Sequence, residues 1–193
     1  MGFLILIGAV VLILLIILLW AIQAYNNFIA IKNNVSKAWS DIEVVLKQRH
    51  NLIPKLIATC KEYMAYEKGT LEEIVSLRNS AQSAVAQHDA KQVSHTETKI
   101  EKNLQKIFAL AENYPDLKAN EAFGHLSEEM ANLENIIVDR RELYNSNVTI
   151  NNTAIESFPA CIVAKKFNFK HFDVLDFDES ETKDVNVSEL FDK

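Results

Sequence analysis

The chain has 193 residues, and its 4 glycines are too few for the turns of a doubly wound nucleotide-binding fold, a phosphate-binding loop or a β-sandwich. Its net charge of −6 arises entirely between Asp173 and Lys193, where eight acidic residues and two lysines lie, so residues 1–172 carry equal numbers of acidic and basic side chains. Because this balanced body lacks the basic surface that contacts to phosphates require, we predict no nucleic-acid partner.

The first predicted element is a membrane-spanning helix. The twenty residues Phe3–Ile22 are Leu, Ile, Val, Phe, Ala, Gly and one Trp, and no side chain before Lys32 is charged. As a helix rising about 1.5 Å per residue, this run covers the roughly 30 Å hydrocarbon core of a bilayer. A cleaved signal peptide would need a basic start, a shorter apolar stretch and a small-x-small cleavage site. The length of the run favours an uncleaved single-pass anchor over residues 1–27, with the lipid bilayer as a partner.

The residues that flank this run predict how the chain lies in the membrane. Trp20 and Tyr25 are placed where interfacial aromatic residues are expected. The basic residues that follow the run are Lys32, Lys37, Lys47 and Arg49. Since only the terminal amine precedes the run, the positive-inside rule predicts a cytoplasmic C-terminal domain and a short N-terminus outside.

A helical bundle is predicted over residues 28–159. From Phe28 to Tyr63 an apolar or aromatic residue recurs every three or four positions, so the first bundle helix continues directly from the membrane helix. Pro54 should kink or break this helix near His50–Ile53, because proline lacks a backbone donor and crowds the preceding turn.

Three further helices follow on the same spacing. They are expected at about residues 70–88, 91–113 and 120–157. A capping box formed by Thr70 and Glu73 opens the second helix, while Pro115 and Pro159 act as breakers after the third and fourth. No stretch before Pro159 alternates with period two. The fold class is therefore all-α, a membrane helix that continues into an antiparallel bundle of about four long helices.

Residues 160–193 are predicted as a tail that is first basic and aromatic and then irregular and acidic. Helix lengths bring the start of this tail back towards the membrane, if each loop reverses the chain. Its aromatic residues either lie in the headgroup region or pack on the base of the bundle, and the spacing favours neither. The candidate membrane-interface residues are Trp20, Tyr25, Phe167, Phe169 and Phe172.

No catalytic, metal or cofactor site is predicted. The five histidines fall on different predicted elements without an HExxH motif, and no GxSxG motif occurs. Cys60 lies on the apolar stripe of the first helix, where a small core residue is expected rather than a nucleophile. The carboxylates are spread over helix faces, and no pair of them stands out.

Polar residues at core-facing positions are the unusual feature of the bundle. Arg49 occupies one position of the apolar stripe of the first helix, and Arg140 or Arg141 occupies one in the fourth. A buried charge is costly unless it is paired, so we expect an interhelical polar network or, alternatively, a surface that binds a partner. The other expected members of this network are Glu134, Tyr144 and Asn145.

Six groups of residues, in this order along the chain, carry a resemblance to a known family. They are Tyr25-Asn26-Asn27-Phe28, Ala38-Trp39-Ser40-Asp41-Ile42, Gln48-Arg49-His50-Asn51-Leu52-Ile53-Pro54, Tyr114-Pro115-Asp116-Leu117-Lys118-Ala119-Asn120, Glu134-Asn135 with Arg141 and Tyr144-Asn145, and Asn152-Thr153 with Phe158-Pro159. Together they resemble the LemA family of bacterial membrane proteins. The resemblance implies an N-terminal membrane helix with a short N-terminus outside, followed by a bundle of long helices. The expected location is the bacterial cytoplasmic (inner) membrane.

The sequence departs from the family pattern at two places. The family usually has a small residue where Arg140 stands, so the resemblance assigns Arg141 to the polar network. The acidic tail after Asp173 lies outside the shared pattern.

The resemblance supplies no catalytic activity. The family often accompanies membrane zinc metalloproteases and envelope stress responses, which implies a scaffold or accessory role. We therefore expect a non-enzymatic, membrane-anchored helical scaffold or interaction protein that self-associates. The alternative is an accessory or adaptor subunit of a membrane metalloprotease in an envelope stress response.

Self-association is expected to use the first bundle helix. The second and third helices are about half as long as the first and fourth, so part of the apolar stripe from Phe28 to Tyr63 should stay uncovered. We expect side-by-side homo-oligomers joined through their bundles, with the membrane anchors parallel.

Overall fold

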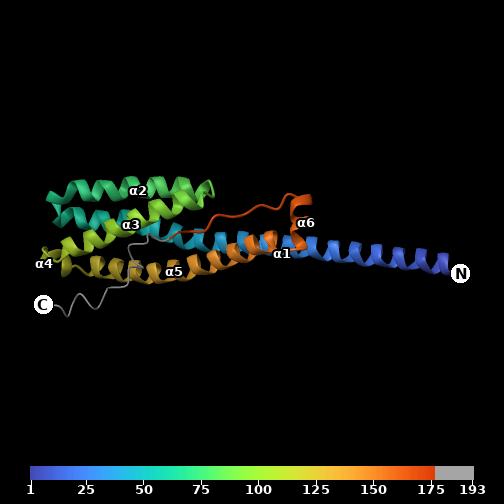
Figure 1. The fold of residues 1–193 in the computed structure, drawn as a ribbon. Helices are drawn as coiled ribbons and strands as arrows, with labels where there is room; N and C mark the ends of the chain where they lie inside the picture. The colour runs from blue at the N-terminus through green and yellow to red at the C-terminus, as the bar shows by residue number, and fades with distance from the viewer. Residues whose placement is uncertain (177–193) are drawn as a thin grey trace, which may run out of the picture. The chain divides into compact units, whose positions relative to one another are not determined.

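The computed structural model describes residues 1–176, and the acidic tail lies outside this range from residue 177 on. The helices are α1 (Gly2–Tyr63), the 3-10 helix η1 (Ala65–Glu67), α2 (Lys68–Ala86), α3 (Ala90–Ala111), α4 (Pro115–Lys118), α5 (Glu121–Glu156) and α6 (Ala160–Lys166) (Figure 1). No strand occurs within residues 1–176. The all-α fold with a long apolar N-terminal helix is therefore confirmed.

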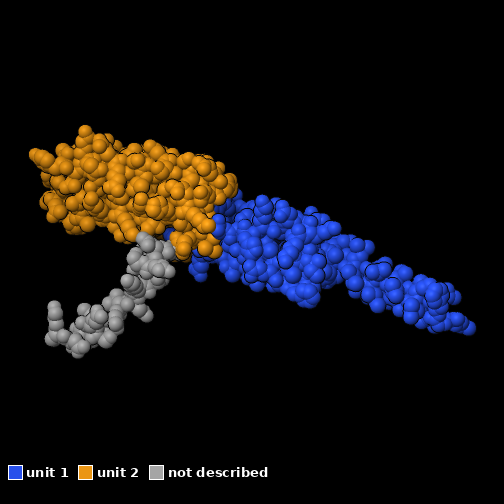
Figure 2. All heavy atoms as spheres, turned by 45° about the horizontal axis from the view of Figure 1, so that its top comes forward, with its two compact units in different colours: residues 1–42, 140–173 blue, residues 43–139, 174–193 orange. Residues whose placement is uncertain are grey.

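The chain divides into two compact units (Figure 2). Unit 1 comprises Met1–Ile42 and Arg140–Asp173, whereas unit 2 comprises Glu43–Asp139 and the segment that begins at Val174. α2, α3 and α4 belong to unit 2 and α6 to unit 1, while α1 and α5 contribute residues to both.

α1 is 62 residues long, and its N-terminal part is apolar enough to cross a membrane. Every large apolar side chain from Phe3 to Leu19 is exposed in the structure. Apolar side chains exposed around a whole helix are stable only in an apolar surrounding such as lipid. The N-terminal segment of α1 therefore fits a membrane anchor.

Beyond the anchor, α1 buries its apolar stripe within the chain itself. The buried members of the stripe are Phe28, Val35, Trp39, Ile42, Leu46, Ile53, Leu56 and Cys60. The expectation that part of this stripe stays uncovered is thus wrong. Estimates of helix length could not predict this, because they give no weight to short elements such as α6, which supplies Val163 and Ala164 to the core around Phe28.

Pro54 was predicted to kink or break α1, and it does not break it, since the helix continues to Tyr63. Proline lacks the N–H that would bond to the carbonyl of residue 50, four positions earlier. In the structure Arg78 of α2 replaces that donor, because its Nε lies 2.7 Å from the His50 carbonyl oxygen and donates to it. A side chain from a neighbouring helix therefore satisfies the carbonyl that Pro54 leaves without a partner.

Replacing Arg78 with Ala should lower the free energy of unfolding by about 1 to 3 kcal/mol, because it leaves a carbonyl unsatisfied in a buried setting. Replacing Pro54 with Ala restores a backbone N–H to the same carbonyl. Chemical unfolding of the two single variants and the double variant should therefore show that Arg78→Ala costs less in the Pro54→Ala background. Equal costs in both backgrounds would contradict the coupling.

The predicted capping box at Thr70 is also wrong, because α2 begins at Lys68 and Thr70 is buried in its first turn. The chain reverses earlier, at the fully buried Met64, and η1 leads directly into α2. The N-cap residue is Glu67, and its side chain makes no capping hydrogen bond.

α2 and α3 lie side by side in opposite directions, joined by a tight turn (Figure 1). His88 in this turn has a φ of 55°, in the left-handed region, and Asp89 caps α3 by accepting a hydrogen bond of 2.9 Å from the backbone N–H of Gln92. The end of the second helix near His88 is thus as predicted.

The other two prolines follow the ends of long helices, α3 and α5, as predicted. Pro115 is the first residue of α4, where its missing N–H costs nothing. Pro159 precedes α6, which runs across α1 rather than along it (Figure 1). α6 was not predicted, because a helix of 7 residues is too short to show a periodic pattern.

Candidate functional site

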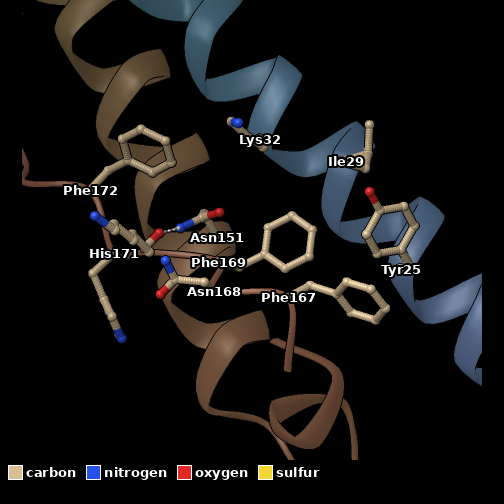
Figure 3. Close-up of a pocket in the computed structure, with 10 residues that line it drawn as sticks. Tyr25, Ile29, Lys32, Asn151, Phe167, Asn168, Phe169, His171 and Phe172 are labelled. Carbon is tan, nitrogen blue, oxygen red and sulfur yellow. Dashed lines mark hydrogen bonds between the residues drawn. The ribbon is translucent and has the colours of Figure 1, made fainter. Parts of the chain in front are cut away.

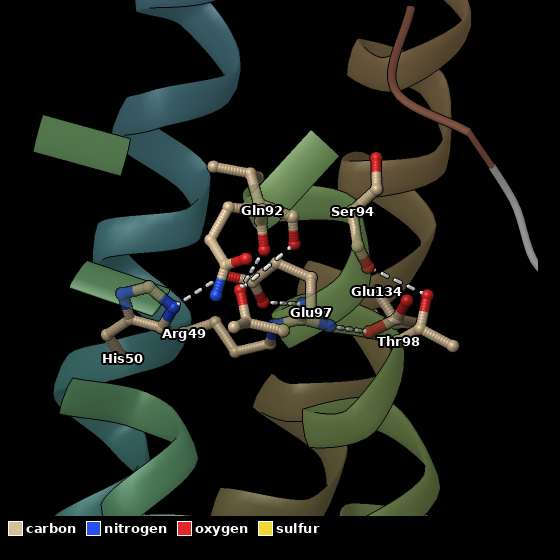
Figure 4. Close-up of polar contacts among 9 residues, drawn as sticks. Arg49, His50, Gln92, Ser94, Glu97, Thr98 and Glu134 are labelled. Atoms are coloured by element: carbon tan, nitrogen blue, oxygen red, sulfur yellow. Dashed lines mark hydrogen bonds and ion pairs between the residues drawn. The ribbon is translucent and has the colours of Figure 1, made fainter. Parts of the chain in front are cut away.

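A buried cluster of charges lies in unit 2, where α1, α3 and α5 meet. The Arg49 guanidinium of α1 forms ion pairs with Glu97 of α3 through Nη2 and with Glu134 of α5 through Nη1 (Figure 4). The side chain of Arg49 is 2% exposed and that of Glu97 5%, whereas Glu134 is 28% exposed. One arginine therefore joins three helices through two carboxylates.

His50 extends this cluster on the other side of Glu97. Its Nε2 lies 2.7 Å from Oε1 of Glu97 and the imidazole is buried (Figure 4). Because an ionised carboxylate can only accept, Nε2 carries the hydrogen and donates. Glu97 is thus held by Arg49 on one oxygen and by His50 on the other.

The electrostatics of the cluster follow from this geometry. Burial alone would raise the pKa of the Glu97 carboxyl, but the charge of Arg49 and the hydrogen bond from His50 outweigh it, and the pKa lies below its usual value. Burial likewise opposes the charge of Arg49, yet Glu97 and Glu134 hold the pKa of its guanidinium above the usual value. Both groups stay ionised although they are buried.

Acid should weaken the fold through Glu97. Its folded-state pKa lies below the ordinary value of 4.5, so the carboxylate contributes stability that is fully present above that value and is lost as the pH falls through the lowered one. Glu97→Gln should be less stable than the wild type near neutral pH and should lose less on acidification. Urea unfolding at several pH values checks this, with the exposed Glu129→Gln as the control. Parallel acid profiles of the wild type and Glu97→Gln would contradict it.

Sequence reasoning identified Arg49 and Glu134 in this cluster but missed Glu97 and His50. Glu97 had a detectable signal, since it lies four residues after Val93 and three before Ile100, at a core-facing position of the third helix. His50 falls beside the stripe position that Arg49 occupies, so the spacing gave no signal for it, although it belongs to one of the family strings.

The structure assigns the remaining predicted network residues to unit 1. Tyr144 packs edge-on against Trp39 at 5.3 Å between ring centroids, and its hydroxyl donates to the carbonyl oxygen of Asp173 at 3.0 Å. Burial, reinforced by the charge of Asp173, raises the pKa of Tyr144 to about 12. Arg141 is buried and Asn145 half-buried, whereas Arg140 is exposed.

The second candidate site is a cavity of about 520 Å³ in unit 1 (Figure 3). It lies beside the part of α1 that directly follows the apolar run. α1 contributes Tyr25, Ile29 and Lys32 to it, and the segment after α6, Phe167–Phe172, forms the opposite wall. We call Phe167–Phe172 the return segment.

Two asparagines of α5 hold the return segment in place. Asn151 is buried and donates to the carbonyl oxygen of Lys170 at 3.1 Å. Asn152 donates to the carbonyl oxygen of Phe172 at 2.9 Å and accepts from its N–H at 3.1 Å. Sequence reasoning did not assign these side chains a role, although Asn152 belongs to one of the family strings.

The aromatic residues predicted for the membrane interface gather at this cavity. The ring of Tyr25 lies 4.7 Å from that of Phe167 and 5.8 Å from that of Phe169 (Figure 3). The ring of Phe28 lies 5.0 Å from that of Phe169. Phe172 also lines the cavity. The aromatic segment packs on α1 at a position that directly follows the apolar run, and its contact with lipid headgroups stays a prediction. Trp20 lines a neighbouring cavity with Phe28 and Pro159.

The described residues hold no group of three or more His, Cys, Asp or Glu side chains with the geometry to bind a metal ion. Each of the five histidines lies on a different segment of the chain.

Comparisons with known proteins agree with this architecture. The model of the LemA family matches residues 38–188, which is most of the chain. Protein LemA of Metamycoplasma hominis is 28% identical over 167 residues, which cover 86% of this chain and 74% of that protein. The magnetosome protein MamQ of Magnetospirillum gryphiswaldense is 20% identical over 172 residues, which cover 77% of this chain and 63% of MamQ. The family match over most of the helices, including those that carry Arg49, Glu97 and Glu134, shows that the chain belongs to the LemA family.

Proposed function

We propose that this protein is a non-enzymatic, membrane-anchored helical scaffold that self-associates at the cytoplasmic membrane of a bacterium. The observation that carries the proposal is α1, a single helix whose first part is apolar and exposed and whose remainder is packed into two helical units. An anchor continuous with a folded domain holds that domain at the membrane. The lysines that follow the apolar run support a cytoplasmic domain.

A surface of α5 supports self-association. Leu143 and Ile150, both in unit 1, are 43% and 52% exposed and lie seven residues apart along the helix. A seven-residue spacing places them on one side of α5, as in the seam between paired helices. We name these two residues the α5 stripe. It replaces the stripe of α1, which is buried, as the surface through which a second copy binds.

Self-association is tested on the full chain in detergent by light scattering. The double variant Leu143→Lys/Ile150→Lys should reduce an oligomer to a monomer, because it places two charges in the proposed contact. The control Ala131→Lys/Thr149→Lys adds the same charges at exposed positions of α5 that lie about 100° or more around the helix from the stripe, and it should leave the mass unchanged. A monomeric wild type would overturn the self-association.

Anchoring and orientation are tested in cells. Protease added to intact spheroplasts should spare both helical units, and the purified protein should retain its N-terminal apolar segment. Digestion from outside would contradict a cytoplasmic domain, and a mature N-terminus near Ala24 would show that the segment is a signal peptide. A metalloprotease recovered in stoichiometric amount with the detergent-solubilised chain would favour the adaptor role over the scaffold.

A further inference from the structure

The cavity between α1 and the return segment begins at the depth of lipid headgroups, if α1 crosses a membrane as proposed above. The apolar run ends at Ile22, and the α1 residues that line the cavity are Tyr25, Ile29 and Lys32. At about 1.5 Å per residue they lie about 5 to 15 Å beyond the end of the run. The headgroup layer of a bilayer begins at this boundary and is about 6 Å thick, so Tyr25 falls within it. Lys32 lies beyond it and contacts the layer only through its long side chain.

Positive charge is concentrated around this cavity. Residues 1–37 and 151–172 together contain five lysines and one carboxylate, Glu156, which lies 3.8 Å from His171. Lys32 and Lys170 line the cavity and are exposed, and Lys165 and Lys166 occupy the last turn of the adjacent α6. The structure thus adds three lysines from the C-terminal segment to those that follow the apolar run.

The cavity also has an apolar wall. Tyr25, Phe167 and Phe169 pack against one another on one side (Figure 3), and Ile29 and Phe172 complete the apolar lining. Near the cavity, Phe158 and Ile162 are 83% and 60% exposed. Lysines beside exposed aromatic and aliphatic side chains are typical of segments that lie in the membrane interface.

We infer that this cavity binds the headgroup of an anionic phospholipid from the membrane that α1 enters. The ammonium groups of Lys32 and Lys170 pair with the lipid phosphate, while Tyr25, Phe167 and Phe169 pack against the glycerol and the first methylene groups. This inference rests on the anchoring part of the proposed function. A lipid with a trimethylammonium group also carries a phosphate, but the surrounding lysines repel its cation. The site therefore prefers an anionic lipid to a zwitterionic one.

The test uses the full chain in detergent and short-chain phosphatidylglycerol, phosphatidylcholine and inorganic phosphate as separate titrants. Native mass spectrometry counts the bound molecules. We expect phosphatidylglycerol to bind at least about tenfold more tightly than either other titrant, and Lys32→Glu/Lys170→Glu to remove this preference. Lys32→Arg/Lys170→Arg should retain it. The control Lys55→Glu/Lys61→Glu, which reverses two exposed lysines of α1 in unit 2, should bind like the wild type.

Three results would overturn the inference. Equal binding of phosphatidylglycerol to the wild type and to Lys32→Glu/Lys170→Glu would place the lipid elsewhere. Equal binding of phosphatidylcholine would show that the aromatic wall alone binds. Inorganic phosphate binding as tightly as the lipid would make the site one for free phosphate. Circular dichroism confirms that the variants fold, and Lys32→Met/Lys170→Met replaces the charge reversal if that variant does not.

Failure of this inference is distinguishable from failure of the proposed function. Light scattering and the spheroplast assay report on self-association and anchoring, and neither depends on the cavity. A chain that is anchored and oligomeric but does not distinguish the two lipids would refute the headgroup site alone.

Discussion

Replacing Arg49 with Ala is expected to lower the free energy of unfolding by about 3 to 5 kcal/mol. Among the described residues, only the Arg49 guanidinium is shown to pair with both Glu97 and Glu134. Without it, Glu97 stays 5% exposed and keeps only its hydrogen bond with His50. An uncompensated carboxylate in that setting either remains charged at a high cost or takes up a proton, and both outcomes destabilise the fold.

Urea unfolding of the full chain in detergent, followed by circular dichroism, measures this loss. Arg140→Ala is the matched control, because Arg140 is an exposed arginine and its removal should change stability by less than about 0.5 kcal/mol. A triple variant with Met at positions 49, 97 and 134 should recover much of the stability lost by Arg49→Ala, since it leaves no charge unpaired. Equal stabilities of Arg49→Ala and the wild type would show that the cluster is open to water.

Replacing Phe28 with Ala is expected to cost about 3 to 5 kcal/mol as well, through a different cause. Phe28 is 2% exposed and lies at the centre of the unit 1 core, with Ile155 of α5 and Val163 and Ala164 of α6. Removing the ring leaves a cavity and deprives Phe169 of one of its two aromatic neighbours among the described residues, the other being Tyr25. α6 and the return segment should therefore be the first parts to detach.

Hydrogen exchange of the amides in residues 160–172 checks this, because local release speeds exchange there before it does so in α2 and α3. Phe158→Ala removes an equal ring that is 83% exposed and should leave the exchange rates and the stability almost unchanged. Uniformly faster exchange over the whole chain after Phe28→Ala would mean that the core of unit 1 is not a separate unit of unfolding.

The long helices were predictable from sequence because their apolar residues repeat over many turns. α3, α5 and the packed part of α1 each bury the side chains that the spacing indicated, among them Ile42, Ile100 and Val148. α6 was not predictable in this way, because two turns give too few repeats.

The errors arose where a tertiary contact outweighs a local rule. Pro54 was expected to kink or break its helix, and a break does not occur. The rule considers only the donor that proline lacks, and the Arg78 side chain that replaces it comes from another helix. Thr70 has the residue pattern of a capping box, but the burial of Met64 fixes an earlier reversal of the chain.

The candidate sites were predictable only in part for a related reason. The position of Arg49 in an apolar stripe indicated that it needs a partner, and the pattern of one helix cannot show which other helix supplies it. Glu97 is identified as that partner only once α1 and α3 are packed together. The cavity was still harder to predict, because it forms only when segments distant in the sequence pack together. Lys32 and Lys170 are 138 positions apart.

The two cysteines differ in exposure, so a thiol reagent can label one of them selectively in the native chain. Burial raises the pKa of the Cys60 thiol to about 11, so little of it is the reactive thiolate at neutral pH. The sulfur is also buried in the core, where a maleimide cannot contact it. Cys161 is only partly buried and lies on α6, the helix whose last turn carries Lys165 and Lys166 and which leads into the return segment. An environment-sensitive fluorophore can therefore be attached at that one position without any mutation, and its emission would report directly on how polar the surroundings of α6 are in a bilayer.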